Sequence, residues 1–169
     1  MTALITFVLS NFTLTFLVIG LIVSGSSLLV SRPKSSYEVV DRFLAGYLFF
    51  AIGLCFLYNF VMHVFFAERA AAFIGWDNSP FQYEVGYASL GFAAVALLAH
   101  RSTYHFRLAA ILGPALFMWG AAIGHIYQIV TKHNYAPGNA GIMLWSDIFL
   151  PVIGFALLYF DYPHSKVQE

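Results

Sequence analysis

Long apolar stretches constrain this chain more than any other feature. Four of them exceed the 18 or so mostly apolar residues that a helix needs to cross a bilayer, and a fifth, after Glu84, reaches that length if Tyr and Gly are counted. Only 9% of the residues are charged, whereas about 25% are charged in a typical soluble domain. The sequence therefore predicts an all-α membrane protein, a bundle of about five transmembrane helices.

Short polar connections separate the predicted spans, and residues 1–169 form a single transmembrane domain. The spans are Ala3–Leu29, Phe43–Phe66, Pro80–Ala99, Leu108–Val130 and Ile142–Phe160. The N-terminal stretch has neither a basic region nor a small-residue cleavage pattern. We therefore expect a retained first helix and not a signal peptide.

The distribution of Lys and Arg predicts the orientation. Six basic residues fall on one side of the predicted bundle and two on the other. The larger set is Arg32, Lys34, Arg42, Arg101, Arg107 and Lys166, and the smaller set is Arg69 and Lys132. Because cytoplasmic loops are enriched in Lys and Arg, we expect the N-terminus outside and the C-terminus in the cytoplasm of a multi-pass inner (plasma) membrane protein.

The formal net charge is zero, and no basic stripe is present that could neutralise phosphates. Nucleic acid is therefore excluded as a partner. The lipid bilayer is the first expected partner, and a homo-oligomer or a larger membrane complex is the next.

A short lid is predicted on the outer surface before the third span. Ser79, Pro80 and Gln82 have the spacing of an N-cap, a Pro at the first helical position and the closing Gln of a capping box. Residues 67–79 precede this start, are rich in Ala and amphipathic, and carry Trp76 at the expected level of the headgroups. Together with Thr131–Gly141 they are expected to cover the outer end of the bundle.

Four ionisable side chains, His63, Glu84, His125 and Asp147, are predicted to lie at one depth. Each sits three to five residues inside the outer end of a different span. At a rise of about 1.5 Å per residue, they lie roughly 5 to 8 Å below the outer surface. Five residues are expected to support this layer: Asn59, Glu68, Tyr87, Gln128 and Ser146. The inner half holds mainly Ser24, Ser26 and Ser27, which predicts sealed apolar packing there.

Two His and two carboxylates form a ligand set suited to Zn²⁺, Mn²⁺, Fe²⁺ or Cu²⁺. A satisfied structural cluster that fixes helix register is the main alternative. A proton-linked or small-molecule site is a further one, in which the carboxylates act as acid and base. Haem held by His63 and His125 is disfavoured by the neighbouring acidic groups. Catalysis stays open; a metal-activated water with Glu84 or Asp147 as general base would be its simplest form.

One segment resembles a known sequence pattern. It comprises His63-Val-Phe-Phe-Ala-Glu-Arg and, a few residues later, Phe73-Ile-Gly-Trp-Asp-Asn-Ser-Pro-Phe-Gln-Tyr-Glu-Val-Gly86. This segment resembles one found in small bacterial and archaeal inner-membrane proteins of unknown function. The resemblance implies that His63, the lid and Glu84 act as one unit, and it implies no chemistry.

Three functions follow from these features, in order of preference. The first is an inner-membrane protein with a polar, metal-binding site on its extracytoplasmic side. The second is a non-enzymatic accessory or assembly subunit of a larger membrane complex, in which the polar layer is structural. The third is a small proton-coupled carrier, which the size of the chain and the polar-free inner half disfavour.

Overall fold

The computed structural model describes residues 2–33 and 35–165, and these residues contain helices and no strand. The prediction of an all-α fold is confirmed. In chain order the elements are α1 (Thr2–Ser10), α2 (Phe12–Val30), α3 (Ser36–Gly46), the π-helix η1 (Tyr47–Leu54), α4 (Cys55–Phe65), α5 (Ala67–Ile74), α6 (Phe81–Ala99), α7 (Tyr104–Lys132), α8 (Pro137–Ala140) and α9 (Ile142–Ser165).

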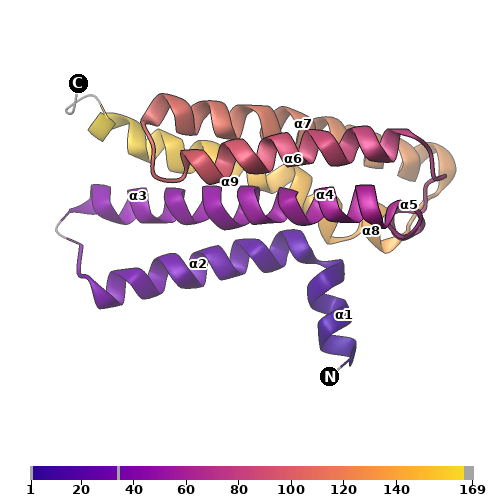
Figure 1. Ribbon diagram of the computed structural model, residues 1–169, viewed down its shortest axis with the longest axis horizontal. Coiled ribbons are helices and arrows are strands. Elements are labelled where there is room, and N and C mark those ends of the chain that lie inside the picture. Colours follow the sequence, from indigo (N-terminus) through magenta and orange to yellow (C-terminus); the bar gives the residue numbers. More distant parts are fainter. Residues whose placement is uncertain (1, 34, 166–169) are drawn as a thin grey trace.

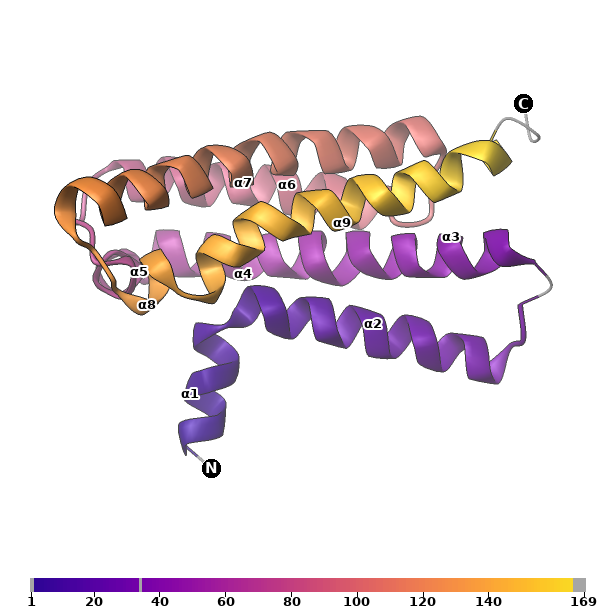
Figure 2. The same cartoon turned by 180° about the vertical axis from the view of Figure 1, so that it is seen from behind.

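Five rods run side by side along the long axis of the molecule: α2, the continuous α3–η1–α4, α6, α7 and α9 (Figures 1 and 2). The short helices α5 and α8 meet at one end, which we call the lid end. The α2–α3 connection, the α6–α7 connection and the end of α9 lie at the opposite end, which we call the α3 end.

Four segments of the described chain are long and apolar enough to cross a membrane: Phe12–Val30, Ser36–Phe65, Tyr104–Lys132 and Pro137–Tyr162. The rod α6 is not one of them, although it is 19 residues long. Its first turn contains Gln82 and Glu84, which lower its apolar character.

The first rod is shorter than the predicted span. At Asn11 the backbone leaves the helical conformation (φ −115°, ψ 40°), and the side chain donates to the carbonyl of Phe7 at 2.9 Å. Such local side-chain bonds to the backbone compete with helix continuation. As a result α1 turns away from the bundle with Leu4 and Ile5 exposed (Figure 2), and the apolar rod begins at Phe12 instead of Ala3.

The middle of the bundle is filled by apolar side chains. Leu44, Leu48, Ile52 and Ile111 are almost completely buried and belong to one cluster that extends to Leu150. The π-helix η1 carries part of this cluster; the wider i→i+5 turn of a π-helix is uncommon, and sequence periodicity gives no sign of it.

Helices α4 and α6 approach closely because α6 has a glycine where they cross. A Cβ on Gly86 would lie 3.3 Å from Cβ of His63 and 2.5 Å from Cγ2 of Val64. Small residues at helix crossings permit this approach in membrane bundles. Since Gly86 lies one turn after Gln82, the same crossing sets His63 against Gln82.

We predict that Gly86→Val lowers the free energy of unfolding by about 1 to 3 kcal/mol, because the added side chain forces α4 and α6 apart. The matched control is Gly91→Val on the same helix, since a Cβ there meets nothing within 4 Å. Thermal unfolding in detergent micelles measures both variants. Equal midpoints would contradict the close packing of these helices.

Candidate functional site

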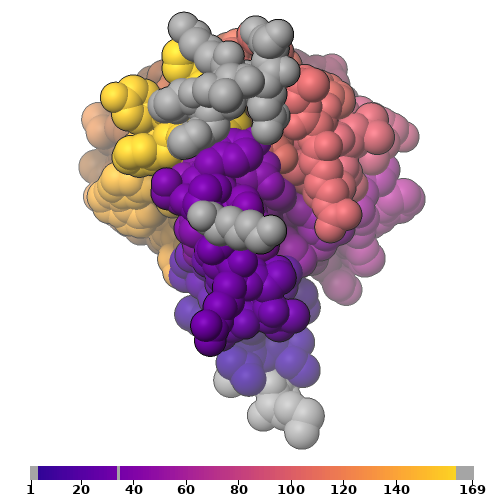
Figure 3. All heavy atoms as spheres, turned by 90° about the vertical axis from the view of Figure 1, so that its left-hand side faces the viewer, coloured from indigo at the N-terminus to yellow at the C-terminus, as the bar shows by residue number. Residues whose placement is uncertain are grey.

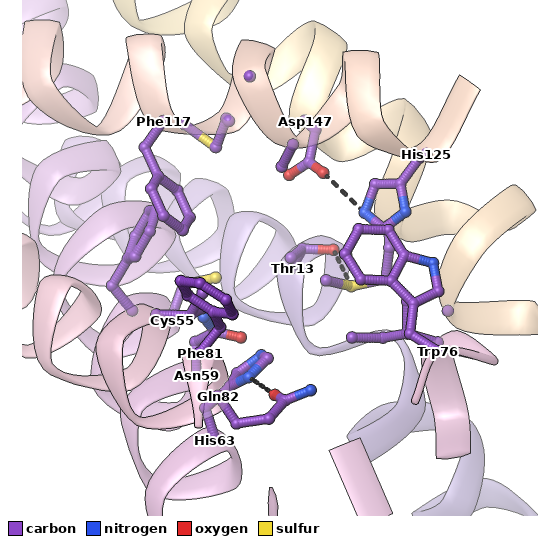
Figure 4. A pocket seen from close by; sticks show the side chains of 18 of the residues that line it. Thr13, Cys55, Asn59, His63, Trp76, Phe81, Gln82, Phe117, His125 and Asp147 are labelled. Carbon is purple, nitrogen blue, oxygen red and sulfur yellow. Dashed lines mark hydrogen bonds and ion pairs between the residues drawn. The ribbon is translucent and has the colours of Figure 1, made fainter. Parts of the chain in front are cut away.

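A cavity of about 500 Å³ lies within the bundle at the lid end (Figure 4). Side chains from α2, α4, α6, α7 and α9 and from the connection after α5 line it. Most of the lining is apolar and includes Phe56, Phe117 and Met118. Two polar pairs interrupt it on facing walls, His63 with Gln82 and His125 with Asp147.

The first pair links α4 to α6. Nδ1 of His63 lies 2.5 Å from Oε1 of Gln82, and both residues are buried. An amide oxygen can only accept, so Nδ1 carries the proton of this bond and Nε2 of a neutral ring has a free lone pair. Asn59, one turn before His63, also lines the cavity and donates to Oγ of Ser89 at 2.9 Å.

This position of Gln82 differs from the predicted capping box. The structure starts α6 at Phe81 with no side-chain cap, and the backbone N–H of Gln82 bonds instead to the carbonyl of Ser79 at 3.0 Å. The Gln82 side chain is taken up by His63. The capping-box prediction was therefore wrong, and its closing residue belongs to the cavity.

The second pair links α7 to α9. Nε2 of His125 lies 3.5 Å from Oδ2 of Asp147, and both side chains are buried. Beside Asp147, Ser146 shares a 2.7 Å hydrogen bond with Thr13 of α2. Thr13 lines the same cavity, so this bond ties α2 to the wall that carries the second pair.

Asn139 of α8 fixes the orientation of His125. It is completely buried, and its Nδ2 donates to the backbone carbonyls of Asn134 at 2.9 Å and His125 at 3.3 Å. These donor bonds set the amide so that Oδ1 accepts from Trp76 Nε1 at 3.0 Å and from His125 Nδ1 at 2.8 Å. With Nδ1 protonated, Nε2 of His125 faces Asp147. One proton can therefore reside either on Nε2 or on the carboxyl group of Asp147, and the pair can accept or release it.

The lid segments contact each other above the cavity. Helix α5 ends at Gly75 in the left-handed conformation (φ +74°), which a residue without Cβ adopts at little cost. Asn134 donates to the carbonyls of Ile74 at 3.0 Å and Gly75 at 3.1 Å. The Trp76 ring then lies over His125 with 5.4 Å between ring centroids, which closes this side of the cavity.

The predicted site residues separate into two groups. His63, His125, Asp147 and Asn59 line the cavity, and Ser146 is buried beside it. Glu84, Glu68 and Tyr87 are exposed, and Gln128 is half-buried outside the lining. The buried face of α6 runs through Gln82, Gly86 and Ser89. Glu84 lies two residues from Gln82, about 200° around the helix.

The predicted four-ligand metal site is not supported. Among residues 2–33 and 35–165, no group of three or more His, Cys, Asp and Glu side chains could hold a metal ion. Glu84 faces away from the cavity, and His63 is bonded to an amide instead of a carboxylate. The side chains bonded to Nδ1 of the two His rings are neutral amides, Gln82 for His63 and Asn139 for His125.

Comparison with known proteins adds a family and no activity. Residues 10–167, which are most of the chain, match the model of a family of unknown function, DUF6790. No curated protein and no solved structure matches the chain.

Proposed function

Because the chain belongs to this DUF6790 family of unknown function, we propose its function from its own site. It is a five-span membrane protein that binds a compact amphiphilic molecule in the lid-end cavity. The cavity carries the proposal: an apolar chamber of about 500 Å³ with one polar pair on each of two facing walls. Ligand cavities of this size and composition bind molecules through a few convergent polar groups.

We propose that α6 is the fifth span. It starts beside α5 at the lid end and leads into the α6–α7 connection at the α3 end (Figure 1). It is shorter than α7, with 19 residues against 29, but at about 1.5 Å per residue it spans about 28 Å, close to the thickness of a bilayer's hydrocarbon core. Arg32, Arg42, Arg101 and Arg107 lie toward the α3 end, whereas Arg69 and Lys132 lie toward the lid end; Lys34 and Lys166 fall outside the described residues. The bias favours a cytoplasmic α3 end, an outer lid end and an external N-terminus in the plasma membrane.

Cysteine labelling tests this topology. On a Cys55→Ala background, we expect Arg69→Cys and Lys132→Cys to react with a membrane-impermeant maleimide in intact bacterial cells. Arg101→Cys should react only after permeabilisation. All three side chains are exposed, and Arg69 and Arg101 flank α6. Labelling of both from the same side would show that α6 does not cross the membrane.

The ligand chemistry follows from the two pairs. His63 Nε2 offers a lone pair and the Gln82 amide offers N–H groups, so this wall accepts and donates. The His125–Asp147 wall exchanges a proton with its ligand. A neutral molecule with an oxygen function at each of two ends and an apolar body satisfies both walls. Quinones have this form, since each ring oxygen accepts a hydrogen bond when oxidised and donates one when reduced.

Thermal stabilisation by a short-chain ubiquinone analogue, oxidised and reduced, tests the proposal. At a concentration of about 100 times its Kd, a ligand that binds the folded state alone adds about 2.7 kcal/mol to the free energy of unfolding. We expect His63→Leu and Asp147→Leu to abolish the shift in melting temperature. The control Tyr87→Phe, at an exposed position of α6, should preserve it. No shift with either probe, or equal shifts in all variants, would refute binding of this class in the cavity.

A second candidate function is an accessory subunit of a membrane complex, favoured by α1. This helix projects from the bundle, and Leu4, Ile5 and Phe7 on it are more than half exposed. Purification of the full chain from its native membrane tests this role. A stoichiometric partner lost on Phe7→Ser would support the role, whereas a monodisperse protein without a partner would count against it.

The carrier, our third prediction, finds no support. The cluster around Leu48, Ile52 and Ile111 lies between the lid-end cavity and the α3 end. A carrier needs a polar path through this region, and this cluster is apolar. We therefore propose that the lid-end cavity takes up and releases its ligand on the outer side only.

A further inference from the structure

A second cavity, of about 590 Å³, lies at the α3 end. Its walls come from α2, α3, η1, the α6–α7 connection and the start of α7. Figure 3 faces this end, where the α3 region lies between the end of α9 and the α6–α7 connection. The sequence predicted sealed apolar packing in this half, and the structure contradicts that prediction at its outermost layer.

The lining of the second cavity is rich in cations. Arg42, Arg101 and Arg107 line it together with His100, against the single carboxylate of Asp41. Asp41 is engaged by Arg107, whose Nη1 lies 2.6 Å from Oδ1, and the same Nη1 lies 3.9 Å from Oδ2 of the buried Asp161 outside the lining. Arg42 donates to the backbone carbonyls of Ser27 and Ser31 at the C-terminal end of α2, which offset only part of its charge. Within the described chain neither Arg42 nor Arg101 pairs with a carboxylate, so these two side chains supply the positive charge of the cavity.

Arg107 is held at the wall of the cavity by the protein itself, because its guanidinium lies between the carboxylates of Asp41 and Asp161. The residue is only 5% exposed, and its Nη2 donates to the carbonyl of His100 at 3.0 Å. Its Nε is fully buried and has no acceptor among the described residues. Buried donors without an acceptor are rare and costly, and a bound ligand or water is a common explanation. Because Nε is closed off from the cavity, a buried water fits this position better than a ligand in the cavity does.

We propose that this cavity binds the phosphate of an anionic phospholipid. Guanidinium groups match phosphate in charge and geometry, and basic pockets between transmembrane helices on the cytoplasmic side bind lipid headgroups. Phe49, Phe50 and Val23 complete the lining. These apolar side chains suit the glycerol and acyl part of a lipid, which favours a lipid over free phosphate. The proposal rests on the membrane placement given above and is independent of the ligand of the lid-end cavity.

Native mass spectrometry of the full chain in a neutral detergent tests the proposal. The probes are dioctanoyl phosphatidylglycerol, dioctanoyl phosphatidylcholine and inorganic phosphate. We expect phosphatidylglycerol to bind more tightly than phosphatidylcholine. Arg101→Ala should weaken the binding of phosphatidylglycerol about fivefold, as expected for the loss of one surface cation. Lys132→Ala, which removes an exposed cation at the lid end, should leave its Kd unchanged.

Three outcomes would overturn the proposal. Equal binding of the two lipids would show that charge does not select the ligand. Equal effects of Arg101→Ala and Lys132→Ala would show unspecific attraction. Displacement of phosphatidylglycerol by inorganic phosphate at comparable concentration would assign the cavity to a soluble anion instead of a lipid. Because the Arg101 side chain is exposed and bonds to no other described residue, Arg101→Ala is expected to fold.

Discussion

Asn139→Ala is expected to lower the free energy of unfolding by about 3 kcal/mol, because several buried polar groups lose their partner at once. The side chain is completely buried and bonds to the Trp76 indole, both the ring and the backbone carbonyl of His125, and the carbonyl of Asn134. These bonds join α7 and α8 to the connection after α5.

The same substitution is expected to weaken binding of the ubiquinone probe about tenfold, which is the equivalent of one well-oriented hydrogen bond. Without Asn139, Nδ1 of His125 loses the acceptor that keeps Nε2 directed at Asp147. Thermal unfolding and probe-induced stabilisation measure the two effects separately.

Two variants accompany this experiment. Asn78→Ala, at an exposed position near the lid, should change stability by less than about 0.5 kcal/mol. Asn139→Asp keeps the shape but replaces the Nδ2 donor by an acceptor that faces two carbonyls, so it should be at least as damaging as Asn139→Ala. A stable Asn139→Asp variant with normal probe binding would contradict the assigned amide orientation.

Asn139 also shows what sequence reasoning could not find. Its surroundings, Pro137-Gly138-Asn139, have the composition of a loop. Helical periodicity reports which apolar residues face inward, and a buried amide in a connection has no such pattern. Trp76 was placed at the membrane surface from its amphipathic character, whereas its indole N–H is bonded to Asn139.

Depth along a helix was easier to predict than direction around it. Counting residues from the predicted span ends put His63, His125 and Asp147 at the same end of the bundle, and all three line one cavity. Glu84 lies in the first turn of α6 at that same end but on the opposite face from Gln82. In a bundle surrounded by lipid, large apolar residues occur on both faces of a helix: Leu48 and Ile52 are buried, whereas Leu116 is exposed. A strongly apolar sequence therefore gives little information on direction.

The α3 end demonstrates a related difficulty. Arg107 was assigned to a connection, because a basic residue beside a predicted span is expected to contact water or headgroups. In the structure it lies in the first turn of α7, buried between Asp41 of α3 and Asp161 of α9. These partners are 66 and 54 residues away in sequence, so no local pattern connects them. The cationic cavity became visible only when the bundle brought these helices together.

Arg107→Met is expected to lower the free energy of unfolding by about 3 to 5 kcal/mol, because it removes the guanidinium that lies between Asp41 and Asp161 in a largely buried ionic cluster. Nη1 of Arg107 lies 2.6 Å from Asp41 Oδ1 and 3.9 Å from Asp161 Oδ2, and the Arg107 and Asp161 side chains are 6% and 4% exposed. Met retains most of the length of the side chain, so the loss reflects charge more than volume. Arg101→Met, at an exposed position six residues earlier, is the matched control and should change stability by less than about 0.5 kcal/mol.

Neutralising the partners distinguishes charge from packing. Arg107→Met/Asp41→Asn/Asp161→Asn removes all three charges of the cluster. We expect much of the lost stability to return, since replacing a whole buried ion pair costs far less than removing one member. Denaturant unfolding of the wild type, the single variant and the triple variant gives the comparison. If the triple variant were as unstable as Arg107→Met, the guanidinium would stabilise the fold through its packing and its bond to the His100 carbonyl. In that case the ionic cluster would not be the contact that joins α3, α7 and α9 at this end of the bundle.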